Sequence, residues 1–416
     1  MEDKLRTVRE MLNQDKAKKA EAFVSRLLRT EPSTTQVAQL LALRARAHLL
    51  NANPEQGLKD LQQLQNIAPD VFNQPQTQET LADCYLARFE LSAIGFTDRT
   101  YLTKAQETYQ ALLENHPNYE NSGWILYQYG RSWLASDNIT RAVSSFQKAL
   151  NNPSKSPTHK ANCYERLGYI EFYHHRNFER ALELLNLALA VYPNGADPTW
   201  LVQLHLQRAR ILQATNQPEA MIQVVSTAIK IAVEDLQQDR PFISDTLFTS
   251  AELVAAVPGF EQRAVALLER FVQISPRPVG INVTWSRAYE MMGDLYFELG
   301  RYDAATAAYS TALQFNPYHP WGVSVYYRMA KSQYQQGNYA EAVNIIQHMV
   351  NHAHAESEPV TDYRVYDILG NALFAQERYT EAAQAYQTAM SLAHDSAEGL
   401  DKIKLYYHFS RQLAQQ

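Results

Sequence analysis

The densest group of possible metal ligands lies between residues 348 and 358. It contains His348, His352, His354, Glu356 and Glu358. Imidazole and carboxylate groups bind zinc, and side chains four residues apart on a helix lie on one face. The same histidines would close a predicted helix, where protonated imidazole is favoured by the carbonyl end of the helix dipole. We interpret them as helix-terminal residues and predict neither a metal nor a cofactor.

No segment carries a catalytic or nucleotide-binding motif. The sequence lacks G-x-x-x-x-G-K-[ST], G-x-G-x-x-G, H-E-x-x-H and G-x-S-x-G. Cys84 and Cys163 are the two cysteines, too few for a disulfide framework or a four-thiolate zinc site. We expect both to be buried in helices. The sequence therefore predicts a protein that is not an enzyme.

The composition favours a helical, folded chain. Glycine supplies 14 of 416 residues, about half of its usual share of ~7%, which argues against a β fold with many turns. The hydrophobic share of 46% is enough for a large core. No stretch approaches the roughly 18 apolar residues of a membrane span, and the segment from Met1 to Arg6 is too charged for a secretory signal. We expect a cytoplasmic protein without membrane contact.

Charge is distributed unevenly along the chain. Residues 1–50 hold ten basic and six acidic residues, whereas residues 351–400 hold two basic and eight acidic residues. The net charge of the whole chain is −6, which argues against a nucleic-acid partner.

A repeat of about 40 residues organises the chain. Its clearest copy consists of Tyr289, Met292, Gly293, Tyr296, Ala305, Tyr309, Ala312 and Pro317. Similar copies begin at Tyr326, Tyr366, Leu126 and Tyr164, and weaker ones bring the total to about ten. Prolines that end the second helix of a unit provide an independent mark of the period: Pro32, Pro69, Pro117, Pro153, Pro193, Pro276 and Pro317.

The pattern closely resembles the tetratricopeptide repeat family, whose eight signature positions are all matched by the copy at 289–317. We predict an all-α fold, an α-α superhelix of about ten helix-turn-helix repeats. Residues 1–276 would form an N-terminal array of about seven repeats, several degenerate, and residues 285–395 a C-terminal array of three well-matched repeats. Residues 396–416 would be a C-terminal capping helix. We expect one continuous superhelix, with 277–284 as a candidate hinge.

Small residues are expected where two helices of a hairpin cross closely. These structural positions are Gly130, Ala142, Gly168, Ala181, Gly293, Ala305, Ala330, Ala342, Gly370 and Ala382. Tyr302 and Tyr379 are expected in the turns, beside the N-cap candidates Asp303 and Thr380.

The resemblance implies that a peptide lies in a concave groove lined by the first helix of each repeat. Position 9 of these helices is basic in five of ten units, where 9% Lys and Arg would give about one. The candidate binding residues are Arg9, Arg46, Trp124, Tyr127, Arg131, Arg210, Tyr327, Lys331, Tyr334, Asn371 and Phe374. Arginine forks and aromatic rings suit a segment with carboxylates and bulky apolar side chains. In the alternative interpretation, the arginines pair with acidic neighbours in adjacent repeats.

The sequence thus predicts a scaffold or adaptor that binds a partner protein or peptide. The family's clamp for chaperone C-terminal tails is not predicted, because no repeat supplies its first Lys–Asn pair. Two alternatives stay open: a regulatory or assembly subunit of an enzyme complex whose catalysis is on another chain, and a helical-repeat RNA-binding protein.

Overall fold

The computed structural model describes residues 1–14, 16–92, 99–193, 195, 197–317, 322–355, 360–394 and 397–415. Its contacts divide the chain into two compact units, Met1–Asp197 and Pro198–Gln416. The division therefore falls earlier than the candidate hinge at 277–284, which connects two helices within the second unit. A single continuous superhelix stays a prediction.

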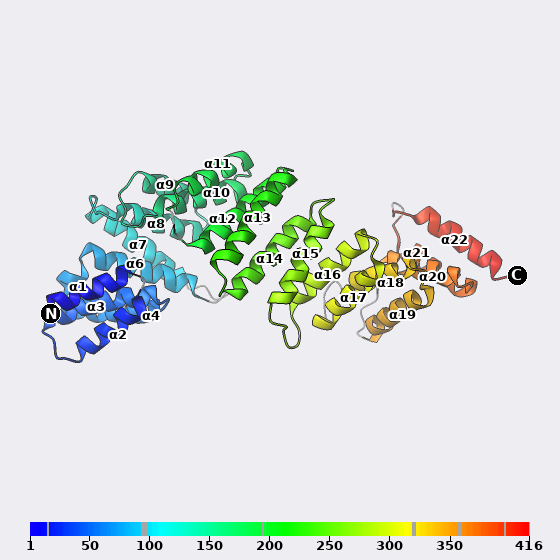
Figure 1. The fold of residues 1–416 in the computed structure, drawn as a ribbon, viewed down its shortest axis with the longest axis horizontal. Coiled ribbons are helices and arrows are strands. Elements are labelled where there is room, and N and C mark those ends of the chain that lie inside the picture. The colour runs from blue at the N-terminus through cyan, green and yellow to red at the C-terminus, as the bar shows by residue number, and fades with distance from the viewer. Residues whose placement is uncertain are drawn as a thin grey trace. The chain divides into compact units, whose positions relative to one another are not determined.

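The first unit is built from five helical hairpins and one short helix within its described part (Figure 1). The hairpins pair α1 (Glu2–Asn13) with α2 (Ala17–Leu28), α3 (Thr34–Leu50) with α4 (Pro54–Ile67), α6 (Pro75–Glu90) with α7 (Arg99–Asn115), α8 (Ser122–Ala135) with α9 (Ile139–Leu150), and α10 (His159–Tyr173) with α11 (Phe178–Val191). The short helix α5 spans Pro69–Phe72. Each first helix also contacts the first helix of the next hairpin, so α1, α3, α6, α8 and α10 form one continuous layer.

The second unit repeats this construction and adds a terminal helix. Its pairs are α12 (Pro198–Ala214) with α13 (Pro218–Asp235), α14 (Arg240–Ala255) with α15 (Glu261–Ile274), α16 (Val283–Glu298) with α17 (Tyr302–Phe315), α18 (Gly322–Gln335) with α19 (Tyr339–Ala355), and α20 (Tyr363–Ala375) with α21 (Tyr379–Leu392). Helix α22 (Leu400–Leu413) packs on α21 and buries Ile403. No strand occurs among the described residues, and the predicted all-α repeat fold is confirmed.

Local sequence accounts for several helix starts, but two predicted caps are not present. The side chain of Asn53 accepts a hydrogen bond from the backbone N–H of Gln56, and Pro54 is the first residue of α4. The predicted N-caps Asp303 and Thr380 are wrong. Helices α17 and α21 already begin at Tyr302 and Tyr379, so Asp303 and Thr380 lie inside the first turn. The aromatic residue therefore starts the second helix and does not lie in the turn before it.

The glycines of the first helices allow a large side chain of the second helix to approach the backbone. A Cβ atom at Gly293 would lie 2.5 Å from the ring of Tyr309, and one at Gly370 would lie 2.6 Å from Tyr386. Gly130 faces Phe146 and Gly168 faces Leu185 in the same way. The alanines at the crossing points are fully or almost fully buried: Ala142, Ala181, Ala305, Ala330, Ala342 and Ala382. The pairing of glycine with a large residue sets how closely each hairpin packs.

Candidate functional site

Three of the predicted binding residues line one cavity of the first unit. Arg9 of α1, Arg46 of α3 and Trp124 of α8 border a space of about 720 Å³, together with Lys155 from the connection after α9. Arg9, Arg46 and Lys155 are exposed. The layered first helices therefore bring together residues that are more than 100 positions apart in the sequence.

The wall of this cavity contains two carboxylates from α6, Glu79 and Asp83. Glu79 accepts hydrogen bonds from the Tyr119 hydroxyl at 2.6 Å and the Asn121 amide at 2.8 Å, and Asp83 accepts one from the Tyr109 hydroxyl at 2.5 Å. Burial raises the pKa of both carboxyls, and the neighbouring Glu79 helps to raise the pKa of Asp83 to about 7. These carboxylates are thus tied into the hydrogen-bonded framework of the unit.

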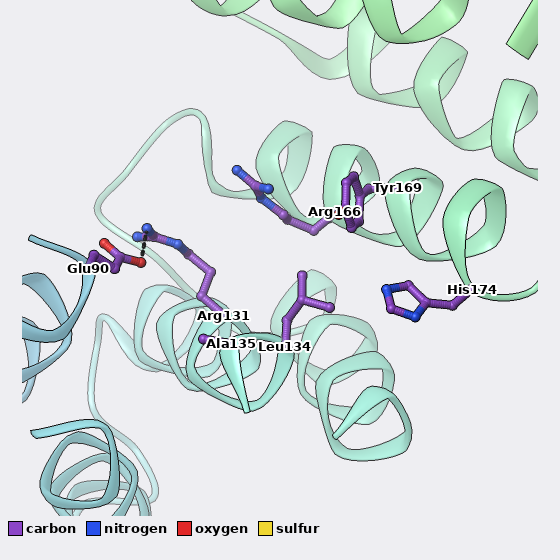
Figure 2. A pocket seen from close by; sticks show the side chains of 7 residues that line it. All are labelled: Glu90, Arg131, Leu134, Ala135, Arg166, Tyr169 and His174. Carbon is purple, nitrogen blue, oxygen red and sulfur yellow. Dashed lines mark hydrogen bonds and ion pairs between the residues drawn. The ribbon is translucent and has the colours of Figure 1, made fainter. Parts of the chain in front are cut away.

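A second cavity, of about 390 Å³, lies between α8 and α10 (Figure 2). Arg131 projects into it from α8, and its Nη2 lies 2.5 Å from Oε1 of Glu90 at the end of α6. Its Nη1 donates a hydrogen bond to Gln128 at 2.9 Å. Arg131 therefore matches the alternative interpretation in part, because it pairs with a carboxylate of the preceding hairpin.

A second arginine, missed in the sequence analysis, lines the same cavity. Arg166 of α10 keeps 37% of its side chain exposed, and its Nε lies 3.1 Å from the buried Glu165 carboxylate. Burial opposes ionisation of Arg166, but Glu165 and the Tyr127 hydroxyl outweigh it and raise the pKa of the guanidinium. Arg166 lies two residues before Gly168. That spacing places Arg166 at repeat position 6, which the family's clamp for chaperone C-terminal tails also uses. The sequence therefore contained a signal that could have identified Arg166 as a binding residue.

The two ends of this cavity differ in chemistry. Figure 2 shows Glu90 and the guanidinium groups of Arg131 and Arg166 toward one end, and His174 at the other. Leu134 and Tyr169 line the space between, and both are half-buried. The cavity therefore offers charged hydrogen-bond donors beside an apolar and aromatic surface.

Two other predicted residues lie apart from these cavities. Tyr127 is only 5% exposed and packs on Phe146 with ring centroids 5.9 Å apart. Tyr127 therefore belongs to the core and is not available for contact with a peptide. Arg210 is exposed on α12 of the second unit.

The remaining predicted residues lie in the second unit. Tyr327 and Lys331 of α18 border a cavity of about 500 Å³. The ammonium group of Lys331 lies 5.2 Å from the Phe297 ring centroid, and the Arg364 guanidinium lies 5.4 Å from that of Tyr327. Both aromatic rings therefore already have a cation of this chain beside them.

Three further candidates are engaged in internal contacts. Asn371 donates to Asp367 at 3.0 Å and accepts from the Tyr386 hydroxyl at 3.1 Å. The Phe374 ring lies 5.2 Å from Tyr406 of α22, and the Tyr334 ring lies 5.3 Å from Tyr339. Capping by α22 thus covers part of the surface that the sequence analysis assigned to a peptide.

An ion-pair network between α16 and α18 was not predicted from the sequence. Arg328 of α18 contacts Asp294 at 2.5 Å and Glu290 at 2.6 Å, both on α16. Glu290 is 3% exposed. Acidic residues on one first helix and an arginine on the next give no periodic signal, so only the packing of neighbouring repeats reveals the network.

The histidine group does not assemble into a described metal site. His348 lies on α19 with its ring 6.1 Å from that of Tyr326. The side chains of His352 and His354, and the residues Glu356 and Glu358, lie outside the described part. Within that part, no three His, Cys, Asp or Glu side chains gather as metal ligands. Cys84 and Cys163 are both buried in helices, as predicted.

None of the helices in the described part is long and apolar enough to span a bilayer.

Comparison with known proteins agrees with the hairpin architecture. Residues 286–351 and 363–395 match models of the tetratricopeptide repeat. This chain is a tetratricopeptide-repeat protein. Such arrays serve in general as scaffolds for interaction between proteins, and the fold is typically non-catalytic. No curated protein is similar to the full sequence.

Solved structures of tetratricopeptide-repeat proteins are similar to this one in fold. The C-terminal part of a protein from Cytophaga hutchinsonii is 16% identical, with a TM-score of 0.48 over 68% of this chain and 97% of that one. A protein from Parabacteroides merdae is also 16% identical, with a TM-score of 0.41 over 70% and 98%. YrrB, described as having an unusual peptide-binding site, is 15% identical, with a TM-score of 0.39 over 53% and 97%.

Proposed function

We propose that the first unit of this repeat protein binds an acidic segment of a partner protein along α3, α6, α8 and α10. The observation that carries the proposal is the cavity between α8 and α10, where Arg131 and Arg166 lie beside Leu134 and Tyr169. A carboxylate would bind at the arginines while a bulky apolar side chain packs on the neighbouring Leu134–Tyr169 surface.

The charges along this layer favour a negatively charged occupant. Five basic residues line its two cavities: Arg9, Arg46, Arg131, Lys155 and Arg166. Three carboxyls, Glu79, Asp83 and Glu90, share the cavities, and all three accept hydrogen bonds from this chain. Arg9, Lys155 and Arg166 lie beside Glu2, Glu120 and Glu165, so an incoming carboxylate would compete with these partners. Guanidinium groups bind carboxylates with paired, directional hydrogen bonds, which gives such a surface specificity as well as attraction.

The binding test uses two residues at the same repeat position in different units. A labelled peptide with leucines flanked by glutamates is titrated into the full chain and into the variants Arg131→Glu and Arg210→Glu. We expect Arg131→Glu to weaken binding by about tenfold or more, because it places a repelling charge at the cavity. Arg210→Glu makes the same change of charge in the second unit and should leave the affinity unchanged. Equal affinity of the two variants would refute the proposal.

Titration with single-stranded RNA tests the alternative that the chain binds RNA and not a protein segment. RNA binding would show an affinity that falls steeply with the logarithm of salt concentration. A peptide anchored by apolar contacts with Leu134 and Tyr169 should weaken less, since salt screens only its charged contacts.

A further inference from the structure

The second unit contains a cavity of different chemistry between α14 and α16. It measures about 490 Å³, and its floor includes Met291 and Leu295 of α16 and Ala255 of α14. Met291 and Leu295 are 7% and 5% exposed, so they present the edge of the core to the cavity. Methionine adapts its shape to different apolar partners, which suits a floor for a partner side chain.

Carboxylates border this floor from both helices. Glu252 of α14 and Glu298 of α16 are exposed and line the cavity. Within the described part of the chain, neither side chain takes part in a hydrogen bond or ion pair. Like charges on either side of an apolar surface repel each other and are stabilised by a cation placed between them.

The other charged residues around the cavity already have hydrogen-bond or ion-pair partners within the chain. Asp294 accepts hydrogen bonds from Tyr309 and Arg328, and Glu261 accepts one from the backbone N–H of Gly259 at 2.8 Å. Arg287, the one basic residue lining the described cavity, lies 3.2 Å from Glu290. The charge left unpaired at the surface is therefore negative.

We infer that the cavity between α14 and α16 is a second binding surface, for a protein segment in which an apolar side chain is flanked by lysine or arginine. The apolar side chain would pack on the exposed Ala256 and Pro258 and on the accessible edges of Met291 and Leu295. The flanking cations would pair with Glu252 and Glu298. Its charge is opposite to that of the first-unit site, so the two surfaces select different segments. The inference does not depend on the proposed function of the first unit.

The test uses two matched peptides and the full chain. One labelled peptide has leucines flanked by lysines, and the other has glutamate in place of every lysine. The glutamate peptide is the probe of the first-unit test, so its affinity should not fall in Glu252→Lys or Glu298→Lys. We expect the lysine peptide to bind and each of Glu252→Lys and Glu298→Lys to weaken it by about fivefold or more, because the attraction becomes repulsion. Glu219→Lys makes the same change on an exposed first-turn residue of α13 and should leave the affinity unchanged.

Two further measurements test whether apolar contacts contribute to binding and whether the peptide binds to the second unit. Replacement of leucine by serine in the lysine peptide should weaken binding without any change to the protein. Arg131→Glu should not weaken it, which keeps this result separate from a failure at the first unit. The inference is overturned if the full chain does not bind the lysine peptide, or if Glu252→Lys and Glu298→Lys bind it as well as Glu219→Lys. It is also overturned if light scattering shows a dimer that Glu252→Lys dissociates, because the occupant would then be a second copy.

Discussion

The hydroxyl of Tyr309 donates a hydrogen bond to Asp294 at 2.7 Å, while the ring of the same tyrosine lies against the backbone at Gly293. The side chain of Tyr309 on α17 thus contacts two consecutive residues of α16, by packing on Gly293 and by a hydrogen bond to Asp294. Tyr386 and Asn371 repeat the arrangement at 3.1 Å. In the hairpin of α8 and α9 the residue facing the glycine is Phe146, which has no hydroxyl, and Arg131 contacts the neighbouring hairpin instead.

Gly293→Leu should lower the thermal stability of the protein. The new side chain would meet the Tyr309 ring, since even a Cβ atom would lie 2.5 Å from it. We expect a loss of about 1 to 3 kcal/mol or more from overpacking, measured by circular dichroism melting. Ala307→Leu adds a leucine at an exposed position of α17 and serves as the control. An equal melting temperature for both variants would show that this close approach is absent.

Arg328→Met should destabilise the second unit more than Arg210→Met does. Loss of Arg328 removes the 2.6 Å partner of Glu290, which is 3% exposed and keeps Arg287 at 3.2 Å. Loss of a charged hydrogen-bond partner from a partly buried carboxylate costs about 1.5 to 3 kcal/mol, whereas an exposed residue such as Arg210 contributes about 0.5 kcal/mol or less. Urea unfolding measures both differences. Similar losses for the two variants would mean that solvent compensates Glu290.

Unfolding of the first unit should depend on pH through Asp83. Burial and Glu79 raise the folded-state pKa of Asp83 to about 7, above its value in the unfolded chain. The folded state therefore binds the proton more tightly, and its stability falls as pH rises from the unfolded-state pKa toward about 7. Asp83→Asn should reduce this fall, because the amide does not ionise and still offers an oxygen to Tyr109; Glu79, whose pKa burial also raises, contributes the remainder. Urea unfolding at acidic and neutral pH, compared between the two proteins, measures the effect. Parallel pH profiles would contradict it.

Glu90→Gln should strengthen binding of the acidic peptide. Glu90 occupies a donor of Arg131 at 2.5 Å, and both side chains are partly exposed. Without the negative charge, an incoming carboxylate no longer competes for the guanidinium, so we expect a gain of a few-fold in affinity. Fluorescence anisotropy gives the affinities. A loss of affinity would indicate instead that Glu90 holds Arg131 in its binding orientation.

Much of the architecture was predictable because repeats carry local signals. Prolines end the second helices: α7 ends at Asn115, before Pro117, and α15 ends at Ile274, before Pro276. Signature glycines such as Gly293 indicated where helices cross, because a large side chain there is excluded by short-range sterics. The predicted caps at Asp303 and Thr380 failed, since the packed aromatic residues before them start the helices.

The sequence by itself determined that the chain consists of about ten helical hairpins and which residues occupy position 9, since both depend on spacing within one repeat. The tertiary structure decided which of those candidate residues are accessible to a binding partner. Arg46 and Trp124 line a shared cavity, Tyr127 is buried, and Arg131 pairs with Glu90 of another hairpin. Contacts between neighbouring repeats join residues about 40 positions apart, and their geometry depends on how the hairpins stack. No local periodicity encodes that stacking, so the ion pairs of Arg328 became visible only in the folded chain. Arg166, at repeat position 6, could have been found from spacing within its own repeat.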